Sequence, residues 1–319
     1  MTLKRSLLHL GLFVLTFITT SFAGVAWLNL DPLELTNFPA GLLYASLLLV
    51  MLLSHEMGHY VAARLHGVDA TLPYFLPFPT HLLPIPMFPF GTLGAVIQLR
   101  SRVPDRRALL DIGAAGPIAG FVVSVIYLVI GFATLPSIEY LYTIHPLYRG
   151  MAAIPTDGLI FGPTLIYSFL QSVVPAKGIF IPPMNEIYHY PFLCVGWFGV
   201  FVTAMNLLPV GQLDGGHVTR ALFGDAHRTI GRVSLGALAL VGLLGFLPLA
   251  GLPDTYGWSG WLFMALILWF VFERKKKRLL ASVPMRDETP PGIGRRVVGW
   301  LCIAILASGF SFAAFTVRM

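Results

Sequence analysis

The sequence predicts an all-α polytopic membrane protein with about seven transmembrane helices and a re-entrant or β-hairpin segment near residues 73–100. Of its 319 residues, 56% are hydrophobic and 11% are charged, and the mean hydropathy is +0.77. Soluble globular proteins are far less apolar. A helix that crosses about 30 Å of hydrocarbon needs roughly 20 mostly apolar residues. Seven stretches meet this requirement, near residues 8–28, 40–63, 108–135, 191–212, 231–252, 257–272 and 297–316.

The first apolar stretch has two interpretations. It follows Lys4 and Arg5 and reaches small residues near Ala23, as a secretory signal peptide does. The apolar run continues to Leu30, however, and this favours a retained first helix. Both interpretations give the downstream helices the same orientation.

The basic residues are distributed by side of the membrane and are not gathered in one soluble patch. With a cytoplasmic N-terminus, all Lys and Arg residues except Arg149, Lys177 and Arg318 lie on the cytoplasmic side, as the positive-inside rule expects. The basic run after Glu273 is typical of the flank of a stop-transfer helix. We therefore expect a multi-pass protein of the lipid bilayer with no nucleic-acid partner.

The whole sequence is expected to form one membrane domain, residues 1–319. The segment 136–190 is too short and too apolar for a typical soluble domain, and within it the stretch 158–175 is expected to form a short helix at the outer interface. The two cysteines, Cys194 and Cys302, fall inside predicted helices and give neither a disulfide framework nor a metal-binding spacing.

A proline-rich segment interrupts the helical pattern. Residues 73–90 contain six prolines in eighteen positions, which excludes a regular helix. Because the segment is too apolar for a loop in water, we expect it to re-enter the membrane where protein covers its backbone. Residues 91–99 then have β character. An open strand edge there would bind an extended peptide by strand addition. The alternative is a hairpin that packs only against the protein's own helices.

The run HEMGH, residues 55–59, lies inside the second apolar stretch. On a helix, residues four apart share a face, so His55 and His59 can present two imidazoles to one ion while Glu56 stands beside a bound water. A chance match is the alternative, but polar clusters in hydrocarbon are costly and are usually functional. The pattern therefore predicts a metal site near the cytoplasmic end of this helix.

A tetrahedral zinc site with two histidines needs one more protein ligand and a water. The candidate is Asp214, which follows an apolar segment that ends at the same membrane level as the histidine pair. Pro209 and Gly211 break the helix just before it. His66 and His217 are competing ligand candidates, and we expect His217 to lie beside the site without binding the metal.

The two motifs carry a family resemblance. HEMGH at 55–59 and NLLPVGQLDGG at 206–216 resemble the site-2 protease family, the intramembrane zinc metalloproteases of peptidase family M50. GTLGA at 91–95 and AGPIAG at 115–120 are similar to the plastid and bacterial branch that lacks a PDZ domain. The resemblance covers a catalytic core of about 40–224 and leaves helices within 231–316 as accessory elements.

The resemblance implies a function and a set of site residues. His55, His59 and Asp214 would bind one Zn²⁺ per chain, Glu56 would be the catalytic glutamate, and Asn206 would hold the substrate or the oxyanion. The implied reaction is hydrolysis of peptide bonds in or near the transmembrane segments of single-pass, membrane-tethered proteins. The resemblance selects neither a particular substrate nor an oligomeric state.

Two other function classes compete with a protease. A metal or ion transporter would use the histidines and Asp214 as a transit site, but such a site does not need Glu56, and the apolar stretches show no inverted repeat. A catalytically silent scaffold usually lacks part of the His-Glu-His-Asp set, which is complete here.

Gly113, Gly116 and Gly120 predict close packing of the third apolar stretch against the catalytic helices.

Overall fold

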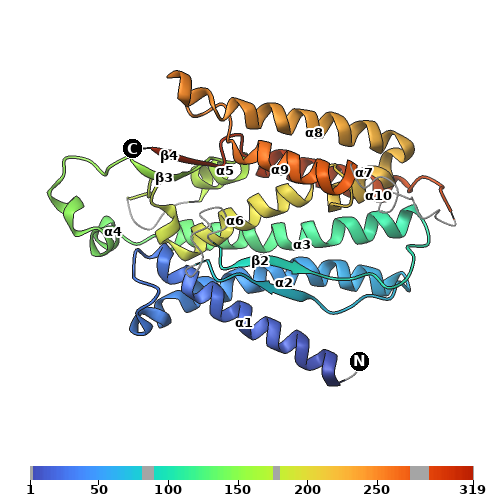
Figure 1. The fold of residues 1–319 in the computed structure, drawn as a ribbon, viewed down its shortest axis with the longest axis horizontal. Helices are drawn as coiled ribbons and strands as arrows, with labels where there is room; N and C mark the ends of the chain where they lie inside the picture. The colour runs from blue at the N-terminus through green and yellow to red at the C-terminus, as the bar shows by residue number, and fades with distance from the viewer. Residues whose placement is uncertain (1–2, 81–89, 175–179, 274–286, 319) are drawn as a thin grey trace.

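The computed structural model describes residues 3–80, 90–174, 180–273 and 287–318. Its long helices lie side by side along the longest axis of the molecule, with α3 in the middle, α1 along one side and α8 along the other (Figure 1). The seven longer or strongly apolar helices are α1 (Leu3–Trp27), α2 (Leu42–Leu65), α3 (Arg106–Ala133), α6 (Pro191–Asn206), α8 (His227–Leu244), α9 (Gly260–Leu268) and α10 (Ile293–Gly309).

Shorter elements connect these helices. The short helices are α4 (Ile138–Ile144), α5 (Leu165–Val173) and α7 (Asp214–Phe223). Single helical turns are η1 (Leu35–Gly41), η2 (Pro146–Gly150), η3 (Ile187–His189), η4 (Gly224–Ala226), η5 (Leu247–Ala250) and η6 (Trp269–Glu273). The strands are β1 (Tyr74–Pro77), β2 (Thr92–Val96), β3 (Gly158–Phe161) and β4 (Phe315–Arg318).

Within the described residues, four helical stretches are long and apolar enough to cross a membrane: Leu3–Trp27, Leu35–Leu65, Arg106–Ala133 and Asp214–Ala250. Two shorter apolar helices are Pro191–Asn206 and Gly260–Phe272. The prediction of a mostly helical protein with several apolar helices is confirmed, whereas the count of seven spans stays a prediction. Large apolar side chains remain exposed along the outer faces of α1, α8 and α10, where lipid would cover them.

Helices α2, α3 and α6 form the centre of the bundle and contact one another. Asp105 begins α3 as its N-cap, accepting a hydrogen bond from the backbone N–H of Ala108 at 2.8 Å. Glycines then allow close approach: a Cβ on Gly131 would lie 2.7 Å from Leu193 of α6, and one on Gly199 would lie 2.0 Å from the hydroxyl of Ser124. Helices α2 and α6, which carry four of the five predicted site residues, are therefore tightly packed around α3.

The predicted β character of residues 91–99 is confirmed for β2. It pairs with β1 in an antiparallel sheet, with Tyr74 opposite Val96 and Phe75 opposite Ala95. The hairpin packs against α1, where a Cβ on Gly91, whose φ is +77°, would lie 2.5 Å from a backbone oxygen. Most of the proline-rich link between the strands, residues 81–89, lies outside the described residues, as does the basic run after Glu273.

The C-terminal end differs from the expectation. The sequence predicts one apolar span over 297–316, but α10 ends at Gly309 and β4 pairs with β3 in a second antiparallel sheet, with Phe315 opposite Phe161. The stretch 158–175 correspondingly forms β3 followed by α5, which contains the expected short helix. The physical reason is non-local: strand pairing and the bond from the Trp261 indole N–H to the Ser311 carbonyl at 3.0 Å hold the chain after α10 in an extended course.

Candidate active site

His55 and His59 lie one turn apart in α2, and both side chains are buried. Their Nε2 atoms are 3.2 Å apart. The Nδ1 atom of His59 lies 2.7 Å from the carbonyl oxygen of Ile112 in α3. Since a carbonyl only accepts, Nδ1 carries the proton, which leaves a lone pair on Nε2 when the ring is neutral. The backbone of α3 thus orients His59 as metal sites generally require.

Two glycines of α3 make room for the two imidazoles. A Cβ on Gly116 would lie 2.1 Å from Nε2 of His59, and a Cβ on Gly120 would lie 3.1 Å from Nδ1 of His55. A Cβ on Gly113 would lie 3.0 Å from the Cβ of His217 in α7. The close packing predicted for these glycines is therefore present, and each of the three glycines lies against a histidine side chain.

Asp214 comes from a different part of the chain. Helix α6 ends at Asn206, the segment 207–213 forms tight turns, and α7 begins at Asp214. Gly211 has a φ of +59°, and a Cβ on Gly215 would lie 1.9 Å from the backbone oxygen of Leu207. This compact turn brings the Asp214 Oδ2 atom to 3.3 Å from the Nε2 atoms of both α2 histidines.

The three converging atoms fit a zinc ion. In a tetrahedral zinc site with bonds of about 2.0–2.2 Å, neighbouring ligand atoms lie roughly 3.3–3.5 Å apart. The three distances among His55 Nε2, His59 Nε2 and Asp214 Oδ2 are 3.2, 3.3 and 3.3 Å. Two imidazoles and one carboxylate are also a donor set that zinc accepts. The residues therefore form one face of a tetrahedron, and its fourth corner is left for a water or a substrate.

A cavity of about 280 Å³ opens at this cluster. Glu56 lines it, is 8% exposed and accepts a hydrogen bond from the backbone N–H of Ile97. Asn206 lines the same cavity from the end of α6. The structure therefore brings all five predicted site residues to one cavity, although the chemical role of each stays a prediction.

Residues 43–248 match peptidase family M50. The chain belongs to this family. The matched region contains both motifs of the cavity, from His55 to Asp214. Together with the long apolar helices, the family assignment confirms an integral membrane protein. The resemblance to site-2 proteases is likewise confirmed.

Named relatives of this M50 chain come from plants. It is 34% identical over 178 residues to the probable zinc metalloprotease EGY1, chloroplastic, of Arabidopsis thaliana, which covers 54% of the chain and 28% of that relative. It is 32% identical over 202 residues to the protein of the same name from Oryza sativa subsp. japonica, covering 62% and 31%. With the Arabidopsis EGY2 protein, also a probable zinc metalloprotease, it shares 27% identity over 215 residues, covering 67% and 34%.

The M50 chain spans about a third of the length of these curated relatives. No solved structure matches it.

Neither competing ligand candidate of the M50 chain, His66 or His217, belongs to the His55, His59 and Asp214 triangle. His66 Nε2 is 2.8 Å from the carboxylate of Asp111, which also accepts hydrogen bonds from Arg295. His217 lines the cavity, as expected, but it is not part of the metal-binding triangle. Sequence reasoning did not find the contacts from Ile97 to Glu56 and from Ile112 to His59, because backbone atoms make them and no residue type signals them.

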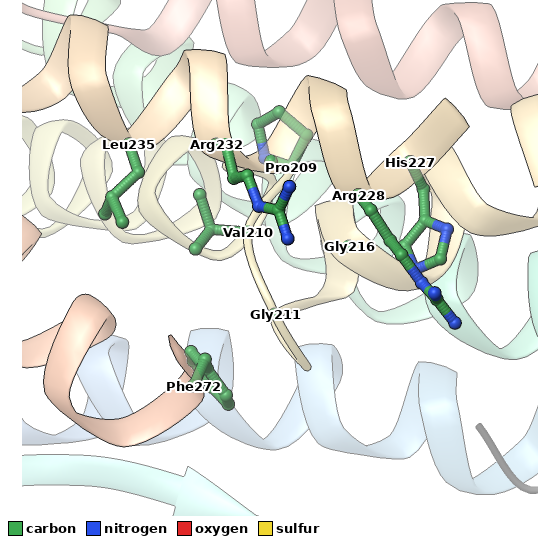
Figure 2. Close-up of a pocket in the computed structure, with 10 residues that line it drawn as sticks. Pro209, Val210, Gly211, Gly216, His227, Arg228, Arg232, Leu235 and Phe272 are labelled. Carbon is green, nitrogen blue, oxygen red and sulfur yellow. The ribbon is translucent and has the colours of Figure 1, made fainter. Parts of the chain in front are cut away.

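A second cavity of the M50 chain lies on the other side of the turn at 207–213, with a volume of about 270 Å³. Figure 2 shows Arg228, Arg232 and His227 around it, all from the start of α8, with Phe272 facing it from η6. The ring of Phe272 packs against the backbone at Gly211. The described residues that line this cavity include no carboxylate, so it does not offer a second set of ligands for a cation.

Proposed function

We propose that this chain is a membrane-embedded zinc endopeptidase that hydrolyses peptide bonds in or near the transmembrane segments of single-pass, membrane-tethered proteins. One observation carries the proposal: a His-His-Asp triangle of zinc-site dimensions shares a cavity with Glu56 and with residues of the segment 95–99. The relatives named zinc metalloproteases support the same reaction. A transporter or a silent scaffold would leave Glu56 without a role.

His55, His59 and Asp214 would hold the zinc ion. When bound, zinc polarises the scissile carbonyl and lowers the pKa of the attacking water to about 7. Glu56 takes the proton from that water and then gives it to the leaving amine. The Asn206 side-chain amide donates a hydrogen bond to the carbonyl oxygen as negative charge develops there.

The membrane arrangement that fits this reaction has seven spans with a cytoplasmic N-terminus. In this arrangement α2 and α6 both run from the outer side to the cytoplasmic side. The cluster lies in the C-terminal half of α2 and beyond the end of α6, so the active-site end faces the cytoplasm. The β1–β2 hairpin re-enters the membrane beside the site. Residues 1–319 form one domain, with a catalytic core of about 40–224 and accessory helices within 231–316.

The substrate is held as an added strand along residues 95–99. The backbone groups of Gln98 and Arg100 bond to the segment 69–71: Thr71 N–H donates to the Gln98 carbonyl at 2.9 Å, and Arg100 N–H donates to the Asp69 carbonyl at 2.7 Å. Because backbone groups alternate along a strand, the intervening Leu99 turns its N–H and C=O toward the opposite side. Residues 95, 96, 97 and 99 all line the cavity.

Replacing Leu99 by proline is expected to slow cleavage about tenfold, because it removes one backbone donor from the edge that faces the cavity. Leu99→Ala is the matched control, since it shortens the side chain and keeps the N–H. Both variants should retain the zinc content of the wild type. Equal cleavage rates for the proline and alanine variants would contradict strand addition at this position.

Metal removal tests the proposed reaction directly. The purified chain in liposomes, supplied with a single-pass membrane substrate, should lose cleavage when 1,10-phenanthroline strips its zinc, and added Zn²⁺ should restore it. The isomer 1,7-phenanthroline, which does not chelate zinc, is the control. Undiminished cleavage by a chain whose zinc content has fallen far below one ion would rule out the zinc mechanism.

A further inference from the structure

A second cluster of two histidines and one carboxylate lies at the other end of the bundle. His145 stands between α4 and η2, Glu186 precedes η3, and His189 ends η3 just before α6 begins. The cluster is about 24 Å from the proposed active site along α6, because that helix has 16 residues with a rise of 1.5 Å each. Nothing in the proposed peptidase reaction uses these residues.

Three potential ligand atoms converge in this cluster. The Nε2 atoms of His145 and His189 are 2.9 Å apart, and they lie 3.4 and 3.3 Å from the Oε2 atom of Glu186. The corresponding distances in the His55, His59 and Asp214 triangle are 3.2, 3.3 and 3.3 Å. The two clusters thus have the same donor types and nearly the same dimensions.

The remaining side-chain polar atoms of His189 and Glu186 already have partners. His189 Nδ1 donates to the backbone carbonyl of Trp27 at 2.7 Å, which leaves a lone pair on Nε2 of the neutral ring. Glu186 Oε1 accepts hydrogen bonds from the Tyr148 hydroxyl at 3.1 Å and the Asn185 amide at 3.2 Å.

The Nε2 atoms of His145 and His189 and the Oε2 atom of Glu186 all face one centre. Glu186 Oε2 is buried and accepts no hydrogen bond from the described residues. The side chains of Glu186 and His189 are each 2% exposed, whereas that of His145 is 21% exposed. A cation at this centre would neutralise the buried carboxylate and bind the imidazole nitrogens together.

We infer that His145, Glu186 and His189 form a second zinc-binding site. Three protein ligands leave the fourth tetrahedral position for a water on the exposed side of His145. The bound ion would join the segment after α4 to the turn before α6. Through the His189 bond to Trp27, it would also fix the end of α1. The site raises the expected zinc content from one ion per chain to two.

Zinc stoichiometry of the purified full-length chain, measured by mass spectrometry after removal of loosely bound metal, tests this inference. We expect two zinc ions in the wild type, one in Glu186→Gln, one in Asp214→Asn and none in the double variant. Glu139→Gln is the matched control, because Glu139 is an exposed carboxylate in the first turn of α4, the helix before His145, and pairs with Arg149. It should keep two ions.

A second readout isolates the new site from the proposed active site. In Asp214→Asn, one Co²⁺ should bind with the intense visible absorption of a tetrahedral site, and added Zn²⁺ should raise the Tm by on the order of 5 °C. Both effects should be absent when Glu186→Gln is added. If that variant does not fold, His145→Gln replaces it, since His145 is the more exposed ligand.

The outcomes separate this inference from the peptidase proposal. If the wild type holds one zinc ion and Asp214→Asn removes it, the second site is overturned and the peptidase proposal stands. His145 and His189 would then share only a hydrogen bond. Zinc lost only in Glu186→Gln, with cleavage absent in every form, would support the second site and contradict the peptidase proposal.

Discussion

Glu56→Gln is expected to lower the cleavage rate roughly 100- to 10,000-fold, the usual contribution of a general acid–base group. Glutamine keeps the size of the side chain and can still accept the hydrogen bond from the Ile97 backbone, but it cannot take a proton from water at neutral pH. Because Glu56 is not one of the three converging ligands, the zinc content should equal that of the wild type. Cleavage of a single-pass substrate in liposomes and zinc per chain are the two measurements.

Glu34→Gln is the matched control, because Glu34 is an exposed carboxylate on the segment that leads to α2. It should cleave at the wild-type rate with the wild-type zinc content. A Glu56→Gln variant that cleaved within a few-fold of the wild type would remove the proposed base from the mechanism. A variant that lost zinc as well as cleavage would indicate that Glu56 supports the metal site and not the proton transfers.

Gly116→Ala is expected to abolish cleavage without changing any proposed ligand or acid–base residue. The added methyl group would lie 2.1 Å from Nε2 of His59, the atom that faces the proposed zinc. The imidazole must move, and this costs both its bond to Ile112 and its place in the triangle. We expect zinc affinity and cleavage each to fall by about 100-fold, the upper end of the loss seen when a group that orients a metal ligand is removed.

A series of glycine variants gives this prediction its controls. Gly120→Ala should have a smaller effect, because its methyl group would lie 3.1 Å from His55 Nδ1. Gly236→Ala on α8, where no atom lies within 4 Å of the added methyl, should leave zinc and cleavage unchanged. Zinc content and cleavage rate, measured for all three, should follow these distances. Normal zinc binding by Gly116→Ala would show that α3 does not shape the site.

The sequence predicted the candidate site well because its residues stand in local patterns. His55 and His59 lie four residues apart, which places them on one face of a helix. Pro209 and Gly211 indicate a helix break shortly before Asp214. The distances among the His55, His59 and Asp214 ligand atoms could not be predicted, because the fold brings Asp214 to the two histidines from a distant part of the chain. What could not be predicted were contacts made by backbone atoms, such as the Ile97 N–H and the Ile112 carbonyl.

Strand β4 and the second histidine cluster were not predicted because both depend on contacts between residues far apart in the chain. Strand β4 forms only because β3 lies beside it, about 150 residues earlier in the chain, and alone its sequence reads as the end of an apolar span. The second cluster had one local signal, the i, i+3 spacing of Glu186 and His189. That spacing places both side chains on one face of a turn. His145 joins them through tertiary structure alone.

The hydrogen bond between His59 and the Ile112 carbonyl has a consequence for how this protein can change over evolutionary time. Every amino acid at position 112 supplies the same carbonyl, so side-chain replacements there leave the acceptor in place. Substitutions at position 112 therefore have little effect on the hydrogen bond that orients the His59 imidazole. Insertions or deletions in α3 are not silent, because a shift by one residue rotates a helix by about 100° and carries the carbonyl away.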